Sequence, residues 1–282
     1  MSLLLPAFTS TPEVNRVYHT DLFTLCDAMP ARSVDMILMD LPYGTTACHW
    51  DSIIPFEPMW ARLKRIIKPR GAIVLTASQP FTSALVMSNP GMFKYSWVWV
   101  KSIAFDFFNA KNKPMKRHED IAVFSLGTTA NLSPNRMSYH PQGVKPISKL
   151  WHRPRQYGSA HNIDRKSHSL RRVIEGEDYP DSVLEFSNGN QDTVHPTQKP
   201  VALFEYLIRT YTLEGELVFD GVVGSGTTAV AARNCKRNFI CGDKELDYVL
   251  TARDRLRLPF EPRQKPVIND VSDLPLFASA TS

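Results

Sequence analysis

The sequence predicts an α/β protein built on a doubly wound, mostly parallel sheet with an antiparallel hairpin at its edge. Apolar runs of strand length alternate with segments of helical periodicity over most of the 282 residues. Two of these runs end in an acidic residue followed by a turn, at residues 40–44 and 220–228. Ligands bind at the carboxyl ends of the strands in open α/β sheets, so both turns are expected to face one cleft.

The elements of residues 14–126 begin with a short apolar run at 34–39, which is typical of a buried parallel strand. Residues 56–67 have a helical rhythm, and Pro69-Arg70-Gly71 is expected to end that helix. Three further apolar runs are predicted to be strands: 72–75, 97–100 and 121–124.

The α/β pattern resumes near residue 200, where Pro200 suits the first position of a helix over 200–211. The elements that follow are a strand at 217–219, a helix at 227–235, a strand at 239–241 and a helix at 247–256.

Residues 127–190 lose this periodicity and are rich in Pro, Ser, Asn, His and Arg. A loop of that length inside a compact domain is usually functional, so we expect an inserted recognition region. The proline-rich tail is expected to be loosely ordered. The expected organisation is one half of the main domain at 1–126, the insertion at 127–190, the second half at 191–258 and the tail at 259–282.

The formal net charge of +5 is distributed unevenly. Residues 136–172 contain nine basic residues and one acid, so they carry +8 and the remainder carries −3. Trp, Tyr and His side chains interleave with these cations, a mixture that suits phosphates and unstacked bases; a solvated face is the alternative. The candidate nucleic-acid contacts are Arg136, Lys145, Lys149, Arg153, Arg155, Arg165, Lys166, Arg171 and Arg172.

The four cysteines show neither CxxC pairing nor the spacing of a His/Cys metal site, so we expect reduced thiols, a cytosolic setting and no metal. No apolar stretch approaches the roughly 20 residues that a membrane span needs. The first residues are too short and lack the basic start of a secretory signal, so no membrane partner is expected.

The loop at 220–228 reads Asp-Gly-Val-Val-Gly-Ser-Gly-Thr-Thr between a strand and a helix, the layout of a nucleotide-type cofactor site. Asp243 ends the next strand, where an acid typically binds ribose hydroxyls. A P-loop would require Lys at Thr227, so a cofactor with ribose but no polyphosphate, such as S-adenosylmethionine, fits best. A plain structural turn is the alternative. The candidate contacts are Asp220, Gly224, Ser225, Gly226, Thr227 and Asp243.

His195-Pro196-Thr197-Gln198-Lys199-Pro200 runs directly into a predicted helix. Free N–H groups at the helix start, together with Thr197 and Lys199, would make a carboxylate-binding corner for the same cofactor. A simple capped helix start is the other interpretation.

Asp40-Leu41-Pro42-Tyr43-Gly44 places an acceptor and a flat ring side by side at a strand end. A flipped base could stack on Tyr43 while its exocyclic amine donates to Asp40 and to the Pro42 carbonyl. A common turn with a surface Tyr is the alternative.

Together these segments resemble the permuted (beta-class) amino-methyltransferases that make N6-methyladenine or N4-methylcytosine in DNA. That family has an Asp/Ser-Pro-Pro-Tyr segment first, then a variable target-recognition region and the cofactor loop last. Residues 195–200 resemble its His-Pro-Thr-x-Lys-Pro signature, and residues 220–228 its Asp-Pro-Phe-x-Gly-Ser-Gly-Thr-Thr loop. The match covers nearly all of residues 16–257 outside the middle block, and the small phage-like members with Asp-Leu-Pro-Tyr-Gly look nearest.

The resemblance implies a Rossmann-like sheet, S-adenosylmethionine as cofactor, and Asp21 near the cofactor adenine. It implies methyl transfer to an exocyclic amine of a flipped base in double-stranded DNA, at adenine N6 because Asp at position 40 goes mostly with adenine. N4-cytosine methylation and a catalytically silent DNA-binding relative remain alternatives, and the motif order disfavours RNA or protein amide methyltransferases. A homodimer in the cytoplasm of a prokaryotic or phage-infected cell, associated with the nucleoid, is the expected setting.

Three positions depart from the family pattern. Leu41 replaces the usual first Pro, Gly221-Val222 replace Pro-Phe beside the cofactor, and Cys241 stands where Gly is common.

Overall fold

The computed structural model describes residues 8, 10–44, 52–152, 171–188 and 198–257. The chain forms two compact units. Unit 1 comprises Met1–His140 with Ser182–Ser282, and unit 2 comprises Pro141–Asp181.

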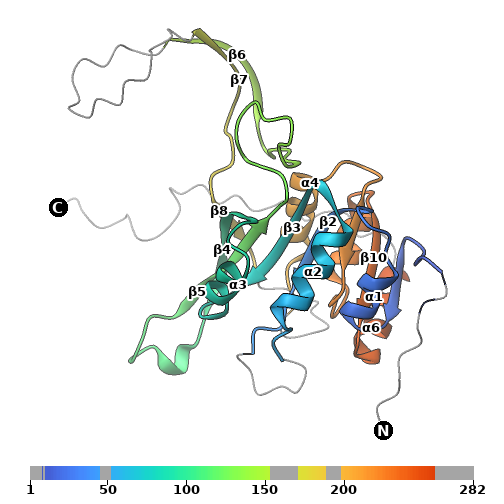
Figure 1. Cartoon of the computed structure of the whole chain (residues 1–282). Helices are drawn as coiled ribbons and strands as arrows, with labels where there is room; N and C mark the ends of the chain where they lie inside the picture. Colours follow the sequence, from blue (N-terminus) through green and yellow to red (C-terminus); the bar gives the residue numbers. More distant parts are fainter. Residues whose placement is uncertain (1–7, 9, 45–51, 153–170, 189–197, 258–282) are drawn as a thin grey trace. The chain divides into compact units, whose positions relative to one another are not determined.

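Unit 1 contains an eight-stranded sheet in the order β1-β10-β9-β2-β3-β5-β4-β8 (Figure 1). Every neighbouring pair is parallel except β3–β5 and β5–β4, so β5 alone runs against the rest. The predicted α/β fold with an antiparallel hairpin is confirmed. The outermost strand on that side of the sheet is β8, which pairs with β4 of the hairpin. The strands are β1 (Arg16–His19), β2 (Val34–Asp40), β3 (Ile67–Ala77), β4 (Phe93–Phe105), β5 (Lys116–Phe124), β8 (Val183–Phe186), β9 (Leu217–Asp220) and β10 (Asn238–Asp243).

Helices cover both faces of this sheet, and β2 shows why its sequence is apolar throughout. Met36 and Leu38 pack in one buried cluster, whereas Ile37 and Met39 pack in the other, because successive side chains of a strand point to opposite faces. The first cluster includes residues of α4 (Val201–Tyr211), α5 (Thr227–Asn234) and α6 (Leu246–Arg257), and the second residues of α1 (Leu22–Ala28), α2 (Phe56–Ile66) and α3 (Phe81–Ser88). Within the described residues, no helix is both long and apolar enough to cross a bilayer.

The expected turn at Pro69-Arg70-Gly71 lies instead within β3. The register with β2 jumps there, from Val34 opposite Ile67 to Met36 opposite Ala72, so the extra residues bulge out. A Cβ on Gly71 would lie 2.6 Å from the Asp35 carbonyl oxygen, so only glycine allows the two backbones this close approach.

The expectation that residues 127–190 lack regular structure is wrong in part. Unit 2 holds an antiparallel pair, β6 (Lys145–His152) and β7 (Arg171–Glu177), and β8 adds to the sheet of unit 1 beside β4. Sequence periodicity misses them because β8 has only four residues and β6 carries a Pro and a bulge. The elements β1, α1 and α3 were also not predicted.

Tyr211, which is fully buried at the end of α4, ties that helix to β4. Its hydroxyl accepts a hydrogen bond from Trp97 Nε1 at 2.7 Å and lies 3.0 Å from the Tyr95 hydroxyl. Tyr211→Phe should lower the free energy of unfolding by about 1–3 kcal/mol, because the buried Trp97 N–H loses its acceptor. Urea denaturation measures this, with exposed Tyr179→Phe as the control; equal losses in both variants would contradict the prediction.

Candidate active site

The polar side chains of the site lie at the carboxyl ends of four adjacent strands, β10, β9, β2 and β3. Asp243, Asp220 and Asp40 are the last residues of their strands, and Thr76 is the Cα partner of Asp40. This side of the sheet is called the carboxyl edge below. The two turns after Asp40 and Asp220 therefore leave the sheet at one edge, as the sequence predicts.

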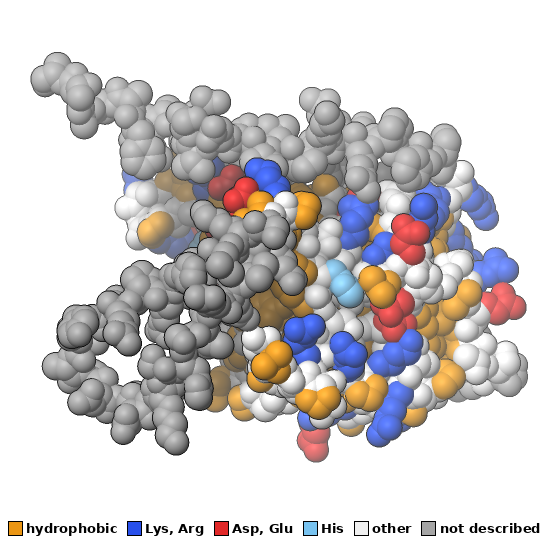
Figure 2. All heavy atoms as spheres, turned by 90° about the horizontal axis from the view of Figure 1, so that it is seen from above, with side chains coloured by type: hydrophobic (Ala, Val, Ile, Leu, Met, Phe, Trp, Pro, Cys, Tyr) orange, Lys and Arg blue, Asp and Glu red, His pale blue; other side chains and the backbone are white. Residues whose placement is uncertain are grey.

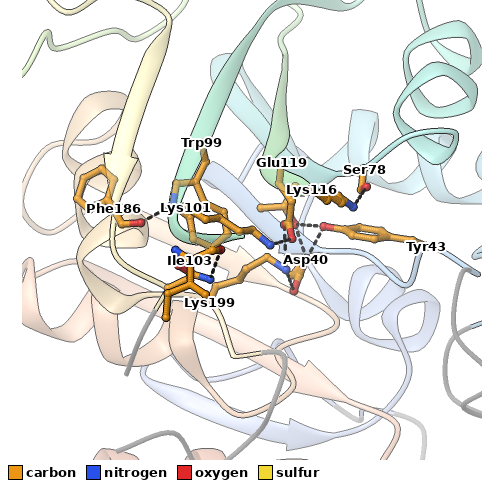
Figure 3. A network of polar contacts seen from close by, with 12 residues as sticks. Asp40, Tyr43, Ser78, Trp99, Lys101, Ile103, Lys116, Glu119, Phe186 and Lys199 are labelled. Atoms are coloured by element: carbon orange, nitrogen blue, oxygen red, sulfur yellow. Dashed lines mark hydrogen bonds and ion pairs between the residues drawn. The ribbon is translucent and has the colours of Figure 1, made fainter. Parts of the chain in front are cut away.

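The Asp40 carboxylate is held by three donors (Figure 3). Its Oδ1 accepts from the Tyr43 hydroxyl at 2.9 Å and from the Thr76 hydroxyl. Its Oδ2 accepts from Lys199 Nζ at 2.8 Å. Because a carboxylate offers about four lone-pair positions, Oδ1 is saturated and Oδ2 keeps one position for a further donor.

The Tyr43 ring packs against Phe81, with centroids 5.3 Å apart and planes 29° apart. Burial, followed by the nearby carboxylates of Asp40 and Glu119, raises the pKa of Tyr43 well above its usual range. The phenol therefore remains a neutral donor to Asp40. Leu41, which stands where the family usually has Pro, is buried in the core beneath this turn.

Lys199 belongs to a buried group of alternating charges that continues into the β4–β5 hairpin. Glu119 Oε2 lies 3.3 Å from Lys199 Nζ, and Glu119 Oε1 lies 2.5 Å from Lys101 Nζ. Lys101, Glu119 and Lys199 are each 8% exposed. Two ammonium groups thus balance the carboxylates of Asp40 and Glu119.

The pKa shifts within this group agree with paired charges. Burial alone would lower the pKa of Lys199, but Asp40 and Glu119 raise it above its ordinary value. Burial alone would raise the pKa of Glu119, but Lys199 and Lys101 lower it. Both residues are therefore ionised near neutral pH.

Lys199 is predicted from the sequence to bind a cofactor carboxylate, and the structure places its ammonium group on Asp40 and Glu119. Its backbone reaches the other half of the site, because the Lys199 carbonyl accepts from the Thr227 hydroxyl at 3.4 Å. One residue thus contacts both the Asp40 turn and the glycine-rich loop. Thr197 lies outside the described residues.

The glycine-rich loop is fastened by two buried carboxylates. Asp220 accepts from the Val222 N–H at 3.0 Å and from the Thr228 hydroxyl at 2.5 Å. Asp243 accepts from the Gly224 N–H at 2.9 Å, and burial raises its pKa. Both acids therefore shape the loop as well as face the carboxyl edge.

One loop glycine leaves room for a ligand, and another allows α6 to pack closely against the loop. Gly224 has a φ of +50°, and a Cβ there would meet nothing within 4 Å, so space is open beside the Asp243 carboxylate. Gly226 has a φ of +90°, and a Cβ there would lie 2.8 Å from Ala252 Cα in α6. Arg255 of α6 donates to the Ser225 carbonyl at 2.6 Å and holds the loop from behind. An open backbone next to a buried acid is what a ribose-bearing cofactor requires.

The departure at Gly221 has a steric cause. A Cβ at Gly221 would lie 2.1 Å from Cδ1 of Leu22, the first residue of α1, so α1 fills the space that a larger residue would need. Asp21 caps this helix by accepting from the N–H groups of Phe23 and Thr24 at 2.9 and 3.1 Å. Asp21 is thus at the carboxyl edge but is engaged as a helix cap. Cys241 is fully buried opposite Asp220 in the sheet.

The predicted nucleic-acid contacts are divided between the two units. Arg136 is exposed in unit 1, and Lys145 in unit 2 forms an ion pair with Asp178 at 2.7 Å. Lys149, Arg171 and Arg172 lie on β6 and β7, and Arg153, Arg155, Arg165 and Lys166 lie outside the described residues. On the face shown in Figure 2, Lys and Arg side chains are spread among polar and apolar ones.

Sequence reasoning missed four residues of this site: Thr76, Lys101, Glu119 and Arg255. Lys101 and Glu119 could have been found, because each is a charged residue within two positions of an apolar run predicted to be a strand. Thr76 and Arg255 carried none, since their contacts depend on which strands and helices become neighbours.

The model of a DNA methylase family, N6_N4_Mtase, matches residues 34–254. The chain is similar to the type II methyltransferase M.HpaI of Haemophilus parainfluenzae, with 27% identity over 260 residues that cover 86% of this chain and 76% of that relative. It is also similar to the type II methyltransferase M2.DpnII of Streptococcus pneumoniae, with 27% identity over 265 residues that cover 84% of this chain and 88% of that relative.

Two solved structures share the fold. The crystal structure of an M1.HpyAVI–SAM complex matches with a TM-score of 0.54 and 23% identity, covering 85% of this chain and 98% of that one. The cytosine-N4-specific PvuII DNA methyltransferase matches with a TM-score of 0.62 and 15% identity, covering 92% of this chain and 91% of that one.

The titration of Asp220 should make the free energy of unfolding depend on pH. Burial raises the pKa of Asp220 to about 7, whereas an unfolded Asp titrates near pH 4, so folding takes up a proton between these values. This contribution favours the folded state at low pH and is lost as the pH rises from about 4 to 7. Relative to Asp220→Asn, the parent's free energy of unfolding should fall by up to about 1.4 kcal/mol per pH unit across that window. Chemical denaturation at several pH values measures both curves, and parallel curves would refute the assignment.

Proposed function

The chain belongs to the N6_N4_Mtase family of DNA methylases, and we propose that it methylates the N6 amine of adenine in duplex DNA at a specific site. Like other members of this class, it takes its methyl group from S-adenosylmethionine. The observation that carries the proposal is the Asp40 carboxylate at the carboxyl edge, where Oδ2 keeps an acceptor position and its donor Lys199 also contacts the glycine-rich loop.

The cofactor would lie along the ends of β9 and β10. When bound, S-adenosylmethionine supplies an electrophilic methyl group on its sulfonium sulfur. Asp243 would accept from the ribose hydroxyls, and the open backbone at Gly224 would let the ligand approach. Gly226, Ser225 and Thr227 hold the loop in shape. We further assign Asp21, Thr197, Lys199 and Asp220 to the surroundings of this ligand.

The target amine would be placed by Asp40. An exocyclic amine of a base is a poor nucleophile because its lone pair is delocalised into the ring. Acceptance of its two hydrogens by Asp40 Oδ2 and the Pro42 carbonyl would favour a pyramidal nitrogen with its lone pair directed at the methyl group. The contribution is orientation and electrostatic stabilisation by fixed acceptors.

Tyr43 would serve this arrangement in two ways. Its ring offers a stacking surface for the flipped base, and its hydroxyl occupies Asp40 Oδ1, which leaves Oδ2 to face the amine. Thr76 and Lys199 are the other two donors to the carboxylate. The acceptor is thus oriented before the base arrives.

The DNA duplex would be bound in part by the basic segment 136–172, for which the +8 charge is the support. We also propose a homodimer, as the resemblance implies, and a cytoplasmic setting, in keeping with the bacterial type II methyltransferase relatives. N4 of cytosine is the second candidate target, because it presents a similar planar amine and the PvuII neighbour is cytosine-N4-specific.

Mass spectrometry of nucleosides from unmethylated bacterial DNA treated with the protein and S-adenosylmethionine tests the target. We expect N6-methyladenine, because position 40 is Asp rather than Ser. Asp40→Ala should abolish the product. The variant should still bind S-adenosylmethionine in calorimetric titration, because the Asp40 carboxylate contacts Tyr43, Thr76 and Lys199 rather than the glycine-rich loop.

Asp27→Ala, which removes an exposed acid paired with Arg62, is the matched control and should retain activity. N4-methylcytosine as the sole product would refute the adenine assignment. Cofactor binding without any DNA methylation by the parent would favour the silent DNA-binding alternative.

A further inference from the structure

The β4–β5 hairpin extends past the carboxyl edge into solvent. Since β4 runs in the same direction as β2 and β3, its last residues lead away from the sheet on the side where Asp40 lies. Trp99 is paired with Glu119, and β4 then continues to Phe105 before the short helix η1 (Phe107–Asn109) and the return into β5. Residues 102–118, called the hairpin tip below, project from the body of unit 1 (green in Figure 1).

The hairpin tip presents apolar rings to water. Phe107 is 75% exposed and Phe108 is 99% exposed, and Ile103, Phe105 and Met115 are also exposed. Single exposed apolar side chains are ordinary, but a group of them on one projecting loop marks an interaction surface.

The tip holds these rings in a defined turn. The Asp106 carboxylate accepts from Asn109 Nδ2 at 2.6 Å and pairs with Lys113 Nζ at 2.5 Å. The Asn109 and Ala110 N–H groups donate to the Asp106 and Phe107 carbonyls, both at 3.0 Å. Little conformational freedom therefore has to be lost when a partner binds.

The charge of the tip identifies the partner class. Four basic residues and one acid give it a net charge of +3, and the cations are Lys111, Lys113, Lys116 and Arg117. Phosphates attract such a group, whereas a second copy of the same tip repels it. Aromatic rings among cations suit bases that have lost their stacking neighbours.

The base of the hairpin is joined to the candidate active site. Lys101 Nζ lies 4.8 Å from the centroid of the Phe105 ring and also pairs with Glu119, which faces Lys199. The hairpin tip is therefore carried by β4 and β5, the same two strands that hold Lys101 and Glu119 near Asp40.

We propose that the hairpin tip is a second DNA-binding element, separate from the basic segment 136–172 and resting on the proposed DNA methyltransferase function. Phe107 and Phe108 stack against bases exposed where the target nucleotide leaves the duplex, and the cations of the tip contact the flanking phosphates. The element faces the DNA beside the target base and contributes to holding the opened duplex.

The test compares the parent with Phe107→Ala/Phe108→Ala and Phe107→Trp/Phe108→Trp. The alanine pair should lose at least roughly tenfold in kcat/KM for unmethylated bacterial DNA and in affinity for a labelled duplex that carries a mismatched adenine, whose extrusion costs little. The tryptophan pair should keep most of both, because its rings still stack. Binding of S-adenosylmethionine, measured by calorimetry, should be unchanged in both pairs.

Two further variants complete the experiment. Lys111→Gln/Arg117→Gln should flatten the dependence of duplex binding on salt concentration. Leu213→Ala removes an exposed apolar side chain that lies before β9, at the amino-terminal end of that strand and away from the carboxyl edge. This variant should behave like the parent.

An alanine pair with parental duplex affinity would overturn the inference while leaving the methyltransferase function in place. A change of oligomeric state in the alanine pair, seen by sedimentation equilibrium, would instead make the tip an interface between copies and also overturn it. If the parent methylates no DNA, the proposed function fails, and the duplex-binding comparison alone decides the role of the tip.

Discussion

The candidate site depends on one buried ammonium group, that of Lys199, placed between the carboxylates of Asp40 and Glu119. The buried Glu119 carboxylate and the half-buried Asp40 carboxylate would repel each other without a cation between them. Lys199 also orients Asp40 through Oδ2, the oxygen that Tyr43 and Thr76 leave with an acceptor position for a substrate donor. Because the Lys199 carbonyl contacts Thr227, the same residue links the Asp40 turn to the glycine-rich loop. Lys199, in the segment directly before α4, therefore joins the Asp40 turn and the glycine-rich loop into one site.

Much of this arrangement could be predicted from local sequence. The apolar run before Asp40 and the Gly-Ser-Gly turn after Asp220 indicate strand ends and loops, and both lie at the predicted edge. The destination of the Lys199 side chain could not be predicted, because its partner Glu119 comes from an antiparallel strand whose neighbours depend on the whole sheet. The strand β8 was missed for a similar reason, since four residues acquire strand structure only by pairing with β4.

The departures from the family pattern show how neighbouring elements compensate for them. Leu41 contributes a buried side chain to the core under the Asp40 turn. Gly221 accommodates Leu22, so α1 packs directly against the glycine-rich loop, and Asp21 caps that helix at the same edge. Compared with the family motif alone, Leu41 and Gly221 lack the usual side chains. In the fold, each of these positions packs against a neighbouring element.

A double-mutant cycle on stability tests the central role of Lys199 most directly. The free energies of unfolding of the parent, Lys199→Met, Glu119→Gln and the double variant would be measured by urea denaturation. If the charges of Asp40, Lys101, Glu119 and Lys199 balance each other, each single variant leaves one charge of the group unbalanced and the double variant restores the balance. The double variant should then be more stable than the sum of the single effects by about 0.5–3 kcal/mol. Single effects that add to within about 0.3–0.5 kcal/mol would contradict the account.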